Sequence, residues 1–272
     1  MTAPAASIPA GSLRAFLALA GAGYRRFSTY TQATFAMAFT NSVFGFLKCY
    51  VFLTVAAGVG GTVLGYDRSQ LATYMWVSQG IIGVINVWGQ PDLVQQIRTG
   101  NVVSDLVRPV DLMLGAAATE SGRFLYSMLI RFAFPIAVGA TFFTLYLPRH
   151  PWTYALFAVA LVLSTALCFC LRYLIALVCF WLLDIRGVWT AWVLMSGLFG
   201  GLQFPVELWP DGVAAFLHLT PFPLLFQGPL DVIVEKRSWE VLGMQAGWLV
   251  VLFGVCRLVQ ARALRRLVVQ GG

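Results

Sequence analysis

The chain has 272 residues, of which 59% are hydrophobic and 11% charged, and its mean hydropathy is +0.79. Soluble globular domains are only about 45–50% apolar, so this composition excludes an ordinary soluble protein. The formal net charge of +7 does not indicate nucleic-acid binding, because the basic residues lie mostly at the ends of apolar runs. Those runs are long enough to cross a bilayer as helices. The sequence therefore predicts an all-α polytopic membrane protein with a single transmembrane domain over residues 1–272.

The first predicted element is an amphipathic helix over residues 12–30. Leu13, Phe16, Leu17 and Ala20 recur at helical spacing. Three arginines accompany them: Arg14, Arg25 and Arg26. Such a helix lies in the membrane surface with its basic side toward lipid headgroups. The alternative interpretation is that this segment is the frayed start of the first span.

Six apolar runs are predicted to span the membrane: 33–58, 70–89, 124–147, 152–183, 188–206 and 241–261. The fourth run has 32 residues, more than the hydrocarbon core requires, so we expect that helix to tilt or protrude. An even number of spans places both termini on the same side of the membrane.

The distribution of basic residues predicts the orientation. If the termini are cytoplasmic, the inner segments hold thirteen arginines and the outer segments four basic residues. Because cytoplasmic loops are enriched in basic residues, we expect a cell-membrane protein with both termini inside. Residues 90–110 then face the cytoplasm, and the proline-rich residues 207–240 face outward.

The predicted cytoplasmic segment is unusually polar for this chain, and residues 92–111 read DLVQQIRTGNVVSDLVRPVD. Leu93, Val94 and Ile97 form a short apolar helical face. Gly100 favours a left-handed residue that ends this helix, and Pro109 favours the end of the helical piece that follows. Two interpretations fit this pattern: a loop that rests on the bilayer, or a coupling element that docks into a partner.

Three basic residues inside the predicted spans need an explanation: Lys48, Arg131 and Arg172. A charge at the bilayer centre costs about 2.5–3.5 kcal/mol on insertion scales. Snorkelling to the interface explains Arg131, whereas Lys48 and Arg172 are candidates for a translocation pathway. Glu207, between two prolines of the outer segment, is a candidate for the outer mouth.

Catalytic and nucleotide-binding patterns are not evident in the sequence. A phosphate-binding loop needs Gly-Lys-Ser/Thr, and neither lysine, Lys48 or Lys236, follows a glycine. No residues have metal-ligand spacing. We see no acidic residue in a span, which disfavours both a membrane-embedded lipid enzyme and a secondary carrier.

Five motifs together resemble the type-2 ABC transporter permeases, in the subfamily that pairs with separately encoded ATPases. The segment IRTGNVVSDLVRPVD at 97–111 looks like a hallmark of these permeases, although its part after Gly100 is more polar. The other matching pieces follow in the family's order: FWLLDIRGVW at 180–189, GGLQFPVELWP at 200–210, LTPFPLLFQGPLDVIV at 219–234 and the ending LRRLVVQGG.

The resemblance implies a six-helix permease with an N-terminal interfacial helix, a coupling helix between spans 2 and 3, and external re-entrant helices between spans 5 and 6. It implies two ABC ATPase subunits as partners, with ATP and Mg on those subunits, and a second permease, identical or homologous. Membrane lipids surround the assembly. The residues implied to contact the ATPase are Asp92, Leu93, Val94, Gln96, Ile97, Arg98, Gly100, Asp105 and Arg108.

The predicted function is therefore that of a transport subunit, which is not itself an enzyme and moves a hydrophobic or amphiphilic substrate out of the cell. The alternatives are a membrane-embedded enzyme acting on lipid and a secondary carrier.

Overall fold

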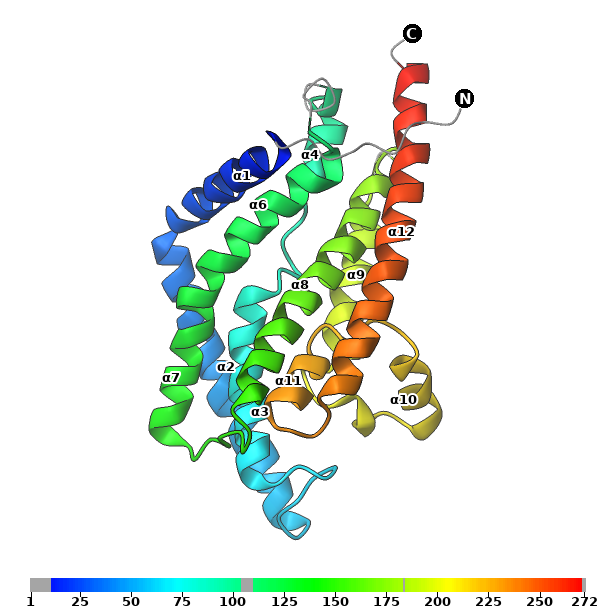
Figure 1. The fold of residues 1–272 in the computed structure, drawn as a ribbon. Coiled ribbons are helices and arrows are strands. Elements are labelled where there is room, and N and C mark those ends of the chain that lie inside the picture. Colours follow the sequence, from blue (N-terminus) through cyan, green and yellow to red (C-terminus); the bar gives the residue numbers. More distant parts are fainter. Residues whose placement is uncertain (1–10, 104–109, 183, 271–272) are drawn as a thin grey trace.

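The computed structural model describes residues 11–103, 110–182 and 184–270. They are almost entirely helical, and Figure 1 shows long helices packed side by side. In chain order the helices are α1 (Gly11–Ser28), α2 (Thr31–Gly58), α3 (Arg68–Val84), α4 (Asp92–Arg98), α6 (Leu112–Ser127), η1 (Met128–Phe132), α7 (Ala133–Phe142), α8 (Trp152–Val178), α9 (Arg186–Phe199), η2 (Val206–Leu208), α10 (Asp211–His218), α11 (Gln227–Ile233) and α12 (Trp239–Gln270).

Four helical stretches of the described chain are long and apolar enough to cross a membrane: 31–58, 112–142, 152–178 and 239–266. The other two predicted spans correspond to α3, with 17 residues, and α9, with 14. A helix needs about 20 residues to cross 30 Å of hydrocarbon, so both are short for a full crossing.

Helix α3 is the central helix of one half of the bundle, and 13 of its 17 residues are buried. Its core residue Trp76 is completely buried between two glycines. A Cβ atom at Gly45 of α2 or Gly139 of α7 would lie 2.7 Å or 2.4 Å from the Trp76 ring. These glycines therefore allow α2, α3 and α7 to pack closely around the indole.

The predicted span 70–89 is wrong at its C-terminal end, because α3 stops at Val84 and residues 85–91 are not helical. Three side chains from other helices bind the carbonyls that this break releases. Arg123 donates to the Val84 carbonyl at 2.6 Å, Trp192 to that of Val87 at 3.0 Å, and Arg172 to that of Gly89. Irregular backbone inside a membrane is tolerated only where protein groups satisfy it in this way.

The predicted span 124–147 begins too late and ends too late. The helix starts at Leu112, because the Asp111 carboxylate accepts hydrogen bonds from the backbone N–H groups of Met113 and Leu114 at 3.1 Å each. It continues through η1 and α7 and stops at Phe142. Its first turns are rich in small residues, which made them too weakly apolar to be predicted as part of a span.

The remaining helix ends also differ from the predictions. Helix α8 ends at Val178 rather than 183, and Asp184 then accepts from the backbone N–H of Arg186 to start α9. Helix α9 ends at Phe199 rather than 206, because Gly201 adopts φ +75°. Helix α12 reaches Gln270 rather than 261, since its end is rich in good helix formers.

The segments predicted to face the cytoplasm, 90–110, and the outside, 207–240, lie at opposite ends of the bundle in their described residues. Figure 1 shows α1, α4 and the C-terminal part of α12 at one end, with α10 and α11 at the other. We call these the α4 end and the α11 end.

A single carboxylate ties two loops together at the α11 end. Glu235 accepts hydrogen bonds from the Tyr146 hydroxyl at 2.6 Å, the Thr153 hydroxyl at 2.7 Å, and the backbone N–H groups of Arg149 and His150 at 2.9 and 3.0 Å. Burial alone would raise the pKa of Glu235, but these donors outweigh it and hold that pKa well below its ordinary value.

We expect Glu235→Gln to lower the melting temperature at neutral pH, because an amide oxygen accepts less strongly than a carboxylate. A depressed pKa stabilises the fold above the ordinary glutamate pKa of about 4.3 and loses that effect as pH falls further. The wild-type advantage should therefore shrink below about pH 4. Thermal unfolding of both proteins in detergent across pH checks this; a difference that is constant with pH would contradict it.

Candidate functional site

The polar segment at the α4 end begins with the short helix predicted from the sequence. Helix α4 has Asp92 in its first turn and Arg98 in its last, which matches the helix dipole. Gly100 adopts φ +76°, so the predicted left-handed break is confirmed. Residues Val102 and Val103 are helical again, while Asp105 and Arg108 lie outside the described residues.

The apolar face of α4 is turned toward its own chain. Leu93 is 4% exposed and Val94 1%, and the half-buried Ile97 packs against the same core. These three residues, which the resemblance implies to contact the ATPase, are covered by the chain's own core in this structure and anchor α4 on the bundle, where it contacts α8. Arg98 and Gly100 are exposed, and Gln96 is half-buried.

Both ends of the segment are bound to other helices by carboxylates. Asp92 forms a two-hydrogen-bond ion pair with Arg26 of α1. Asp111 caps α6 and also accepts from Arg257 of α12 at 2.6 Å. Burial favours protonated Asp111, but Arg257 and the helix N–H groups outweigh it and hold the pKa of this carboxyl below its ordinary value.

The ion pair alone does not hold α1 in place. Its side chains are 56% and 57% exposed, and exposed pairs contribute about 0–1 kcal/mol. Close backbone packing holds α1 instead. A Cβ atom at Gly122 of α6 would lie 1.9 Å from the Ala20 carbonyl oxygen, and one at Gly23 of α1 would lie 2.4 Å from that of Thr119.

A buried ionic cluster of Glu120, Arg123 and Arg172 lies near the polar segment. The Glu120 carboxylate contacts Arg123 at 2.7 Å and Arg172 at 3.4 Å, and both arginine side chains are at most 5% exposed. The arginines also donate to carbonyls at the end of α3 and beyond it. Arg172 therefore joins α8 to α6 and to the non-helical chain after α3.

Glu120 corrects the expectation that the spans carry no acidic residue, since it lies within the helix 112–142. Intramembrane acids are common in carriers, but this one is paired with two arginines. Its spacing of three residues from Arg123 was the available signal, because residues three apart share a helix face. Asp111 was also missed as a contact, although it stands where a helix cap is expected.

The other candidate pathway residues lie away from this cluster. Lys48 donates to the Leu202 carbonyl at 3.0 Å. Glu207 accepts from the Gln227 amide at 2.8 and 2.9 Å and lies 3.7 Å from both Lys236 and Arg237. Arg131 is half-buried, with one contact to Thr34 at 3.3 Å.

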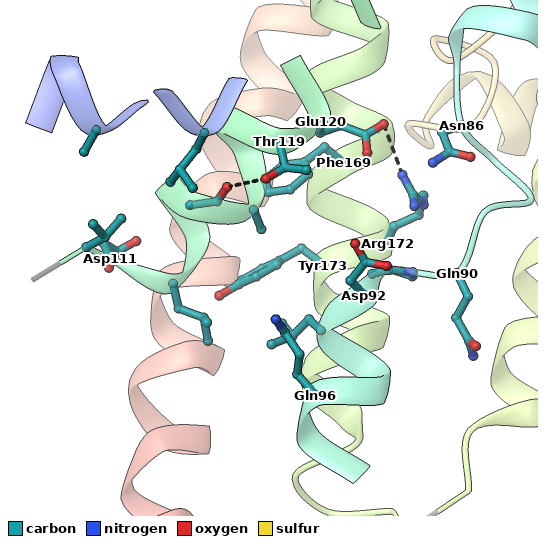
Figure 2. Close-up of a pocket in the computed structure, with 18 of the residues that line it drawn as sticks. Asn86, Gln90, Asp92, Gln96, Asp111, Thr119, Glu120, Phe169, Arg172 and Tyr173 are labelled. Carbon is teal, nitrogen blue, oxygen red and sulfur yellow. Dashed lines mark hydrogen bonds and ion pairs between the residues drawn. The ribbon is translucent and has the colours of Figure 1, made fainter. Parts of the chain in front are cut away.

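A cavity of about 490 Å³ adjoins the polar segment, between α1, α4, α6 and α8. Figure 2 shows polar side chains from separate parts of the chain around it, with the dashed contact between Arg172 and Glu120 at one side. Of the predicted site residues, it brings together Asp92, Leu93, Gln96 and Arg172. Lys48 and Glu207 do not line it.

The long apolar helices and the bound polar segment define a multi-pass helical membrane protein. A family model described as ABC-2 family transporter protein matches residues 42–271, which is most of the chain. The chain therefore belongs to the ABC-2 transporter family and is the transmembrane component of an ABC transporter. Among curated proteins none matches significantly.

Proposed function

We propose that this chain is the permease subunit of an ABC exporter whose energy comes from separate ATPase subunits. The family match carries the proposal. A chain without Gly-Lys-Ser/Thr needs a partner that binds ATP and Mg²⁺. The working unit we propose contains two ATPases and two permeases, identical or homologous. The α4 end then faces the cytoplasm, in keeping with the excess of basic residues on the predicted inner segments.

We further propose that the ATPase contacts the exposed face of α4, on the side away from the bundle. Gln95, Arg98 and Thr99 are exposed there, while the apolar face is anchored on the bundle. Movement of α4 would be passed to α1 through Asp92 and to α12 through Asp111, the two contacts that bind the segment at its ends. Asp105 and Arg108, in the second half of the segment 90–110, remain proposed contacts with the ATPase.

The proposed cargo is hydrophobic or amphiphilic and moves outward. Arg172 is the proposed pathway residue at the α4 end, since it lines the cavity. Lys48 and Glu207 are proposed to act at the α11 end. Lys48 binds the Leu202 carbonyl in the segment after α9, and Glu207, in the same segment, binds Gln227 of α11. That segment would have to shift for an outward opening.

Site-directed crosslinking tests the proposed ATPase contact. The five native cysteines are all buried, so a cysteine at an exposed position is the main reactive thiol. We expect Arg98→Cys to crosslink to an introduced cysteine on the ATPase in the assembled complex. The matched control is Arg149→Cys, an exposed arginine at the α11 end, which should give no crosslink.

A crosslink at position 149 and none at 98 would reverse the proposed orientation. Substrate flux through purified permease without any ATPase would contradict the ATP-driven mechanism itself.

A further inference from the structure

The cavity at the α4 end has the size and lining of a ligand site. Its volume of about 490 Å³ falls in the range of about 300–1,000 Å³ usual for small-molecule pockets. Its uncharged polar lining residues come from more than one element: Asn86 and Gln90 lie between α3 and α4, and Thr119 lies on α6. The remaining wall is largely apolar.

Charge balance favours an anionic group. Three carboxylates line the cavity, and each has an arginine partner: Asp92 with Arg26, Asp111 with Arg257, and Glu120 with Arg123. Arg172 is a fourth arginine, and it shares Glu120 with Arg123. Among the charged residues that line the cavity and their ion-pair partners, one positive charge is therefore in excess.

The excess charge is also incompletely hydrogen-bonded. Arg172 is 4% exposed, and its guanidinium bonds Glu120 and the Gly89 carbonyl. Its Nε has no hydrogen-bond partner in the described structure. A buried donor without an acceptor costs about 1–3 kcal/mol, so a ligand oxygen that reaches this group would relieve that cost.

The apolar part of the lining suits an apolar body. Helix α1 contributes Ala15, Ala18 and Leu19, and α8 contributes Phe169. Helix α1 also carries exposed Arg25 and Arg26, which would attract anionic amphiphiles to the membrane surface beside the cavity.

We propose that this cavity binds an amphiphile with one anionic headgroup, which interacts with Arg172, and an apolar chain that lies along α1 and α8. As a statement about the transported cargo, the proposal rests on the proposed exporter function. Binding itself does not, because it needs only this chain. The occupant is either a membrane lipid or a soluble cargo of the same chemistry.

Binding to the purified full-length chain in detergent tests the proposal without an ATPase. The probes are lysophosphatidylglycerol, which is anionic, lysophosphatidylcholine, which is zwitterionic, and inorganic phosphate. We expect wild type to prefer lysophosphatidylglycerol, and Arg172→Gln to weaken that binding about tenfold, since a charge-assisted contact is lost. Arg68→Gln, at an exposed arginine of α3, is the charge-matched control and should bind normally.

A plug of the cavity provides a test that leaves the ionic cluster intact. A Cβ atom at Gly115 would lie 3.7 Å from Val110 and 3.9 Å from Leu19, so a side chain fits there and projects among lining residues. Gly115→Leu should block lysophosphatidylglycerol, and Gly115→Ala should not.

Normal binding in both Arg172→Gln and Gly115→Leu would overturn the proposal, as would equal binding of the two lysolipids. Binding of inorganic phosphate with the same Arg172 dependence would support a soluble anionic cargo, and lysolipid binding alone would support a lipid source. Absence of transport by the assembled wild-type complex, with binding intact, would count against the exporter function. The binding site would still be supported.

Discussion

Replacing Glu120 with alanine is expected to destabilise the folded chain by about 3–5 kcal/mol, the usual cost of removing one partner from a buried ionic contact. Arg123 and Arg172 are both nearly fully buried and share this carboxylate. Without it, two buried guanidinium groups would have no counter-ion, and only uncharged partners would remain: the Val84 and Gly89 carbonyls and the Ser127 hydroxyl. Repulsion between the two guanidinium groups would strain their hydrogen bonds to the Val84 and Gly89 carbonyls.

The matched variant is Arg172→Met, which leaves Glu120 paired with Arg123. We expect a smaller loss, about 1–3 kcal/mol, chiefly from the Gly89 carbonyl left without its donor. Thermal unfolding in detergent, followed by tryptophan fluorescence, measures both. Equal losses in the two variants would show that Glu120 does not act as the shared counter-ion of two arginines.

Replacing Gly122 with leucine is expected to separate α1 from α6. Even the first added carbon would lie 1.9 Å from the Ala20 carbonyl oxygen and 2.7 Å from the Tyr24 nitrogen. Both are backbone atoms of α1 and move only with the helix. Overpacking a core costs about 1–3 kcal/mol where side chains can adjust; here the adjustment requires displacement of α1.

The measurement is hydrogen exchange of the α1 amides, Gly11–Ser28, which should accelerate in Gly122→Leu. The control is Gly115→Ala, seven residues earlier on the same helix, where an added carbon meets nothing closer than 3.7 Å. ATP-driven transport in the assembled complex should fall with α1 docking if α1 transmits motion from α4. Full transport with rapidly exchanging α1 would exclude α1 from that path.

Several features followed from local sequence alone. Apolar runs predicted helical spans at 33–58, 152–183 and 241–261, because a long hydrophobic stretch in lipid must satisfy its own backbone. Helices long and apolar enough to cross a membrane are found there, at 31–58, 152–178 and 239–266. Amphipathic spacing predicted a helix at 12–30, and α1 is found there. Gly100 marked the end of α4, since a left-handed residue favours glycine. Motifs from residue 97 onward indicated the family, which the match over 42–271 confirms.

Tertiary contacts decided the rest. The Asp111 cap that starts the helix at Leu112 is local. The packing of its first turns against α1 is not, and a weakly apolar run of small residues does not reveal it. The end of α3 at Val84 depends on Arg123, Trp192 and Arg172, from three different helices, binding the freed carbonyls.

The polar segment itself shows the same division. Its charges and its glycine break were readable along the chain, because caps and turns are local. The sequence did not show what covers the apolar face of α4, because Leu93 and Val94 are buried by residues distant in sequence. An apolar face needs burial but does not specify by what; only the packed bundle determined that it is this chain's own core.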